Sequence, residues 1–128
     1  IIDSGILSGH PLLKKAVGDE QNFQEREKTL TDTVGHGTAV AGMALYGDLE
    51  KCVDEKEFKS QNWIFSAKVM YAEEDVNGSY YATYDPEKLV ENQFKEAVEY
   101  FLDNQDNKIR VVNISLGNLN EIWNNPYN

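Results

Sequence analysis

Apolar strand-like segments alternate with segments of helical periodicity along this 128-residue chain. The strand-like segments end at Asp3, cover residues 63–71 and cover residues 109–116, and the helical segments cover 35–46 and 87–103. Strands that alternate with helices favour right-handed crossover connections and a parallel sheet. The order of these segments therefore predicts an α/β fold, in which every strand before the last is followed by a crossing helix.

Both helical segments carry recognisable boundaries. The first is rich in small apolar residues, so we expect close packing on most sides, and Gly47 follows its last turn as a stop signal. The second follows Asp85-Pro86-Glu87, in which an acid precedes a proline at the first turn. Its apolar residues recur at helical spacing, namely Val90, Phe94, Ala97 or Val98, and Phe101. This stripe predicts that one face of the second helix packs on the sheet.

The remaining segments are more polar and predict connections. Residues 18–33 are predicted to be a loop or an edge strand, and residues 48–62 an exposed excursion. Residues 73–84 are predicted to be a loop that turns at Asn77-Gly78-Ser79. The strand over residues 109–116 is strongly apolar and β-branched, so we expect it to be buried on both faces.

Candidate functional residues cluster where the predicted strands end. Asp3 and the segment Ser115-Leu116-Gly117 follow strands, and His36 opens the first helix. Ligands of open parallel sheets bind at the carboxyl ends of the strands. We therefore expect these three segments to converge at one edge of the sheet, although they are far apart in the chain.

Composition excludes several other classes of function. The net charge of −10 and the lack of a basic cluster exclude a nucleic-acid partner. The apolar runs are too short to span a bilayer, so we expect no membrane partner. Cys52, the single cysteine, is interpreted as a spectator thiol, because no histidine lies in a supporting motif near it. Two histidines and one cysteine also argue against a zinc site, and we predict no metal ligands.

Three motifs resemble those of one known family. Ile2-Asp3-Ser4-Gly5-Ile6 resembles the aspartate motif of the subtilases, the subtilisin-like serine peptidases of family S8. The run from Gly35 to Gly42, Gly-His-Gly-Thr-Ala-Val-Ala-Gly, resembles their histidine motif, and the run from Val111 to Gly117 resembles the strand that pairs with substrate. The order Asp before His is also that of subtilisin, with Ser expected last. Each motif alone is weaker evidence than the three in this order.

The resemblance implies a role for each matched residue. His36 is expected to be the general base of a Ser-His-Asp triad, and Asp3 the acid that fixes its tautomer. Gly35 and Gly37 are expected to leave room for chain and substrate beside the ring. Ser115, Leu116 and Gly117 are expected to bind substrate as an added strand. The implied partner is a polypeptide substrate.

The resemblance also implies an incomplete domain. It covers nearly all of residues 1–128 and corresponds to about the first half of a subtilase catalytic domain, a three-layer α/β/α fold with a mostly parallel sheet. Ile1 opens directly in a strand-like segment, so we expect the natural chain to begin earlier. The Gly-Thr-Ser-x-Ala type motif of the nucleophile is absent from these residues, as is the oxyanion asparagine. We therefore expect these residues alone to be inactive.

Two departures from the family pattern concern cofactors and cellular location. Ala39 stands where many subtilases have a second histidine, and residues 48–62 replace a calcium loop of many secreted members. We expect no cofactor: calcium occurs in the full-length family, but no ligand pattern for it is seen here. The localisation is unknown. Family habit favours secretion, whereas the stretch from Ala39 to Asp48 resembles a bacterial branch that acts inside cells.

Alternatives to the peptidase interpretation remain at this point. The first is a non-catalytic subtilisin-fold module, a pseudoprotease that binds peptides; the retained Asp3 and His36 argue against it. The second is an unrelated nucleotide-binding α/β domain, which would need a glycine-rich phosphate loop that the sequence lacks.

The strand predicted over residues 109–116 would lack a neighbouring strand on one side within these residues. An unpaired apolar edge favours pairing with another chain, so we expect a homodimer through it.

Overall fold

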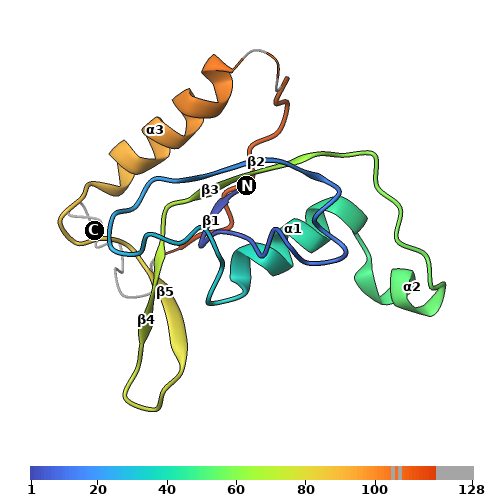
Figure 1. Ribbon diagram of the computed structural model, residues 1–128, viewed down its shortest axis with the longest axis horizontal. Coiled ribbons are helices and arrows are strands. Elements are labelled where there is room, and N and C mark those ends of the chain that lie inside the picture. Colours follow the sequence, from blue (N-terminus) through green and yellow to red (C-terminus); the bar gives the residue numbers. More distant parts are fainter. Residues whose placement is uncertain (105, 107, 118–128) are drawn as a thin grey trace, which may run out of the picture.

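The computed structural model describes residues 1–104, 106 and 108–117. In chain order, the elements are β1 (Ile2–Asp3), β2 (Val17–Asn22), α1 (His36–Tyr46), α2 (Leu49–Asp54), β3 (Ile64–Lys68), β4 (Tyr71–Glu74), β5 (Tyr80–Thr83) and α3 (Val90–Asp103). Figure 1 shows α3 on one side of the strands β1 to β3 and α1 on the other, while the β4–β5 pair extends away from them.

The main sheet is parallel and centres on β3. Both β1 and β2 pair in parallel with β3, which gives the order β1-β3-β2. On the free side of β1, Ile114 forms an isolated parallel bridge with Ile2. This topology confirms the predicted α/β fold, and β2 is the edge strand that was one of the two predictions for residues 18–33.

The register of β1 against β3 separates the two faces of this sheet. Ile2 lies beside Ala67, and both belong to the core cluster that also contains Phe101 of α3. Asp3 lies beside Lys68 on the opposite face, because successive side chains of a strand alternate. The three layers are therefore α3, the sheet and α1, which confirms the predicted α/β/α arrangement.

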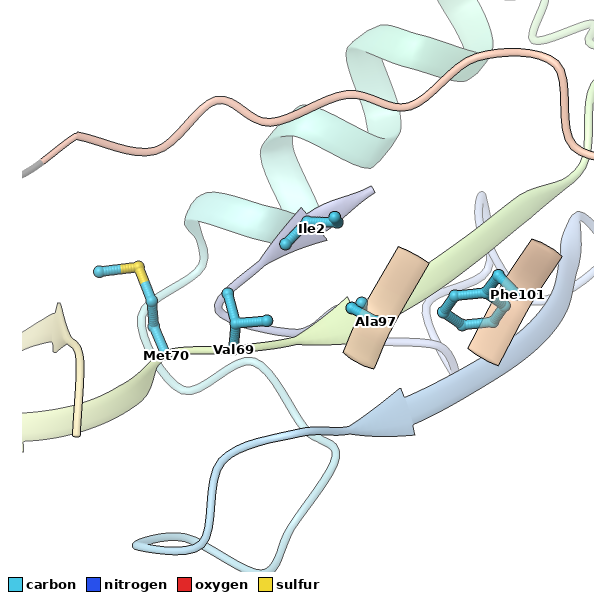
Figure 2. Close-up of a cluster of buried hydrophobic side chains, with 6 residues drawn as sticks. Ile2, Val69, Met70, Ala97 and Phe101 are labelled. Atoms are coloured by element: carbon cyan, nitrogen blue, oxygen red, sulfur yellow. The ribbon is translucent and has the colours of Figure 1, made fainter. Parts of the chain in front are cut away.

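The core under α3 joins the sheet to the second predicted helix. Figure 2 shows Ile2, Val69, Met70, Ala97 and Phe101, which form one cluster between the sheet and α3, and each is at most 7% exposed. The predicted stripe is confirmed in part: Ala97 and Phe101 are buried, and Phe94 and Val98 pack against the cluster while partly exposed. Val90, the first residue of the stripe, is partly exposed and does not belong to the cluster. Burying each large aliphatic or aromatic side chain contributes about 1.5–3 kcal/mol to folding.

The prediction of a buried strand over residues 109–116 is wrong. The segment pairs with β1 through the isolated Ile2–Ile114 bridge and through one hydrogen bond of 2.9 Å from Ile2 N to Asn113 O. Val111 is 80% exposed and Val112 is 48% exposed. Strand preference is realised through packing against neighbouring strands. With β1 only two residues long, this segment gains too few partners to form a ladder.

The two predicted loops contain secondary structure. Residues 73–84 form most of an antiparallel hairpin, in which β4 pairs with β5 from Tyr71–Thr83 to Glu74–Tyr80. Its turn falls at the predicted Asn77-Gly78-Ser79, because the Asp75 carboxylate accepts hydrogen bonds from the backbone N–H groups of Asn77 and Ser79. The excursion over residues 48–62 includes the short helix α2, whose first turn is capped by Asp48.

Both long helices differ in detail from prediction. Helix α1 is buried on one face only: Gly37, Val40, Ala41 and Leu45 are buried, whereas Met43 is 54% exposed. Helix α3 begins at Val90 rather than at Glu87. The Asp85 carboxylate accepts a hydrogen bond from Glu87 N, and the Asp85 carbonyl accepts one from Lys88 N. These bonds stabilise a separate turn before the helix.

Candidate active site

Asp3 ends β1 on the face that α1 covers. Its side chain is 1% exposed, and its carbonyl accepts a hydrogen bond of 2.9 Å from Val69 N. Ser4 N donates to Asp3 Oδ1 over 2.7 Å. Backbone pairing on one side and this amide on the other therefore fix the carboxylate at the carboxyl end of the strand.

His36 is the first residue of α1, and the flanking glycines let the helix begin against β1. Gly35 has φ of 90°, a conformation that glycine adopts without steric cost. A Cβ atom on Gly37 would lie 2.0 Å from the Gly5 carbonyl oxygen and 3.1 Å from Asp3 Oδ1. Space for close approach of the chain is therefore needed at Gly37, as expected, whereas Gly35 is needed for its positive φ.

The structure brings Asp3 and His36 together. His36 Nδ1 lies 2.8 Å from Asp3 Oδ1 and 3.1 Å from Oδ2. An ionised carboxylate can only accept, so this contact assigns the ring proton of a neutral His36 to Nδ1. The imidazole is 49% exposed, and Nε2 is the ring nitrogen that the contact with Asp3 leaves available. Such a ring can take up a proton at Nε2 while the buried carboxylate stabilises the resulting charge.

The negative charge of Asp3 also acts on a nearby phenol. Tyr84 follows β5, packs against the core under α3 and stacks edge-on against Phe94. Burial raises the pKa of Tyr84, and the charge of Asp3 raises it further. Tyr84 therefore stays a neutral phenol close to the candidate site.

Comparison with known protein families identifies the chain. The family model of the S8 peptidases, the subtilase family, matches residues 1–128. The chain belongs to the subtilase family. By family it is thus a serine peptidase, and its substrates are polypeptides. A comparison with curated protein sequences gave no match.

The third matched motif of this subtilase lies beside Asp3. Because Ile114 bridges Ile2, the next residue along, Ser115, comes level with the end of β1. Ser115 and Gly117 are exposed, and Leu116 packs partly against the core under α3. Ser115 Oγ donates to Asn113 Oδ1 over 2.9 Å. The structure thus brings all three predicted segments to one edge of the sheet.

Two charged residues that the sequence did not reveal complete the surroundings of this subtilase site. Asp32 is 8% exposed, and its carboxylate accepts hydrogen bonds from both Ser4 and α1. Lys68 is buried beside Asp3; its Nζ donates to the Thr31 carbonyl over 2.7 Å and lies 2.9 Å from Glu27 Oε2. A lysine inside the apolar run from Ile64 to Met70 was a usable signal of a buried ion pair.

Other residues considered from the sequence lie outside this site. Cys52 is on α2, where its Sγ donates to the Tyr46 carbonyl over 3.8 Å. His10 Nδ1 accepts a hydrogen bond from Leu12 N. Within residues 1–104, 106 and 108–117, no three His, Cys, Asp or Glu side chains are grouped to hold a metal ion. None of the helices in that part of the subtilase is long and apolar enough to cross a membrane.

Proposed function

We propose that this chain supplies the acid–base half of a subtilisin-type serine endopeptidase, with His36 as general base and Asp3 as the residue that orients it. The observation that carries the proposal is the 2.8 Å contact between a buried carboxylate and a half-exposed imidazole. A serine hydroxyl is a weak nucleophile at neutral pH and needs such a base within hydrogen-bond reach.

The proton path follows from the orientation of the ring. His36 Nε2 would take the proton of the attacking serine and later give it to the leaving amine. The Nδ1–H group would stay bonded to Asp3 throughout, so the imidazolium forms next to a fixed negative charge. Asp3 would not need to take up the proton itself. The near-complete burial of its carboxylate strengthens this electrostatic effect.

The nucleophile is not among the six serines of these residues. Ser4 is next to Asp3 in sequence, but its hydroxyl faces carboxylates: Oγ lies 2.9 Å from Asp32 Oδ1 and 3.1 Å from Asp3 Oδ1. It also accepts a hydrogen bond from Gly37 N. We therefore expect residues 1–128 alone to hydrolyse no peptide. Stoichiometric labelling of this chain by a serine-reactive fluorophosphonate would contradict that expectation.

Substrate binding is proposed for Ser115, Leu116 and Gly117. Two observations support the assignment: the segment runs beside β1 near Asp3, and Ser115 and Gly117 are exposed. An extended substrate could pair with their backbone N–H and C=O groups as an added strand. A Cβ on Gly117 would meet open space, so the peptide could approach the backbone closely.

The test uses the full-length protein. The coding sequence after Asn128 should contain a Gly-Thr-Ser-x-Ala type motif, and the purified protein should cleave an unstructured polypeptide. Asp3→Asn is expected to lower kcat by about 10⁴-fold, because the amide would favour the wrong histidine tautomer. His36→Ala is expected to cost at least as much, because it removes the base. A coding sequence without that motif, or peptide binding without cleavage, would instead favour the non-catalytic peptide-binding module.

We also propose that a second copy of this chain pairs with residues 109–114. Val111, Val112 and Ile114 expose between 48% and 80% of their surface on this segment. Beside it, an apolar cavity of about 450 Å³ is lined by Trp63, Phe101 and Leu102. Arg110 lies on this segment and Lys108 directly precedes it, so these two cations locally reduce the repulsion between copies that each carry a net charge of −10.

Sedimentation of residues 1–128 over a range of concentrations tests this self-association. Val112→Lys should favour the monomer, because it places a charge in the paired strand. Val76→Lys is the matched control, because Val76 is fully exposed in the hairpin turn. A monodisperse monomer at high concentration would contradict the proposal.

A further inference from the structure

Asp32 is a buried carboxylate with every acceptor position in use. It lies in the loop between β2 and α1 and is 8% exposed. Its Oδ1 accepts from Gly35 N and from Ser4 Oγ, both over 2.9 Å. Its Oδ2 accepts from Thr38 N over 2.8 Å and from Thr38 Oγ1 over 2.7 Å. A carboxylate offers about four lone-pair sites, so these four donors saturate it.

The two bonds from Thr38 make Asp32 the cap of α1. The residue at the N-cap position, Gly35, has no side chain that could accept from the first turn. Asp32 accepts instead from Thr38, the third residue of the helix, which is where an N-cap side chain usually bonds. A negative charge there also suits the helix dipole. The first turn, which carries His36, is therefore held by a residue outside the helix.

A third bond ties this cap to β1 through the Ser4 hydroxyl. Ser4 Oγ has one proton and two carboxylate neighbours, Asp32 at 2.9 Å and Asp3 at 3.1 Å. Asp3 Oδ1 already accepts from Ser4 N and faces His36 Nδ1. If the hydroxyl proton goes to Asp32, Asp3 keeps its remaining acceptor capacity for the imidazole.

We propose that Asp32 is a positioning residue, which holds the first turn of α1 on β1 and draws the Ser4 hydroxyl proton away from Asp3. The carboxylate thereby fixes both partners of the Asp3–His36 contact without touching the imidazole. The loop that carries Asp32 is itself bonded to the sheet, because the buried Lys68 Nζ donates to the carbonyl of Thr31, the residue before Asp32. The inference rests on the proposed function for its catalytic meaning, but its geometry concerns residues 1–128 alone.

Proton NMR of the chain with ¹⁵N-labelled histidine rings tests this role without any peptidase assay. The Nδ1-bound proton of His36 should resonate far downfield in the parent chain. In Asp32→Ala it should move upfield and exchange faster with water, because α1 loses its cap and the Ser4 hydroxyl turns to Asp3. The matched control is Asp48→Ala, which removes the side-chain cap of α2, a 3.0 Å bond from Lys51 N. That variant should leave the His36 signal unchanged.

Further outcomes separate positioning from general stability. If Asp32→Ala does not fold, Asp32→Asn replaces it: the amide keeps one acceptor oxygen, so an intermediate upfield shift is expected. An unchanged His36 signal in a folded Asp32 variant, or an equal change in Asp48→Ala, would overturn the proposal. In the full-length protein, Asp32→Asn should lower kcat by about 10²-fold with KM nearly unchanged, as small misplacements of catalytic groups do. A protein without peptidase activity would refute the proposed function, whereas the NMR result would still decide the role of Asp32.

Discussion

Asp3 Oδ1 and His36 Nδ1 lie 2.8 Å apart although 33 positions separate the two residues in the chain. One is almost fully buried at the end of a strand, and the other is half exposed at the start of a helix. The contact requires α1 to cross β1 closely, and Gly37 makes this approach possible.

Substituting Gly37 should destabilise the fold and move His36. A Cβ at this position would meet the Gly5 carbonyl at 2.0 Å, so Gly37→Ala forces α1 away from β1. We expect a loss of at least about 1–3 kcal/mol, the usual cost of overpacking, measured by chemical denaturation. Gly42→Ala is the matched control in the same helix, because its nearest new contact is 3.8 Å from Leu49. That variant should gain up to about 1 kcal/mol. Equal effects of the two substitutions would contradict the close approach.

The Lys68–Glu27 pair should respond unequally to removal of each partner. The side chain of Lys68 is 2% exposed, and that of Glu27 is 22% exposed. Glu27→Met leaves a buried ammonium group without its counter-charge, which should cost about 3–5 kcal/mol in the free energy of unfolding. Lys68→Met should cost less, because water can reach the remaining carboxylate.

A surface ion pair provides the control for this comparison. Lys51 of α2 and Glu55, the residue after that helix, form an exposed pair at 3.8 Å. Lys51→Met should therefore change the stability by less than about 1 kcal/mol. If Lys68→Met proved more costly than Glu27→Met, the burial argument would be wrong.

The hairpin provides a test of pH dependence. The phenol groups of Tyr71 and Tyr81 donate to Glu73 over 2.7 and 2.8 Å. The bond to Glu73 raises the pKa of Tyr71 to about 12, from an ordinary value of 10.0. The folded pKa lies above the unfolded one, so the stabilisation is fully present below pH 10 and is lost as the pH rises through about 12.

Replacing the shared acceptor should lower this pKa. Glu73→Gln removes the charge, so the pKa of Tyr71 should fall toward 10, measured by NMR titration of ring-labelled tyrosine. Glu74→Gln is the neighbouring control, because no phenol in the described part of the chain donates to Glu74. An equal decrease in both variants would show that general charge, rather than the hydrogen bonds, sets the pKa.

The fold was predictable where a pattern is local and repeated. The apolar stripe of α3 identified its buried face, and the small-residue helix after His36 identified α1. The Asp3–His36 pair was predictable because two short motifs in the correct order resemble those of one family. In these cases, the sequence pattern was enough to predict both the helices and the order of the two motifs.

The remaining features depend on contacts between distant segments. The segment over residues 109–116 has the composition of a strand, but whether it forms one depends on neighbouring strands that the pattern does not specify. Asp32 looks like an ordinary loop acid in sequence, because its donors include Ser4, which follows β1, and Thr38 of α1. Lys68 is a lone charge in an apolar strand, and the partner that neutralises it lies 41 positions earlier, at Glu27. Such pairings are set by tertiary packing.

The tautomer of His36 tests the central claim most directly. With both rings neutral, the ¹⁵N shifts of labelled histidine distinguish a proton on Nδ1 from one on Nε2. His36 should carry its proton on Nδ1, facing Asp3, whereas His10 should carry it on Nε2, because His10 Nδ1 accepts from Leu12 N. His10 is thus an internal control in the same spectrum. Opposite tautomers that become alike in Asp3→Asn are the predicted result, and a His36 protonated on Nε2 in the parent chain would contradict the account.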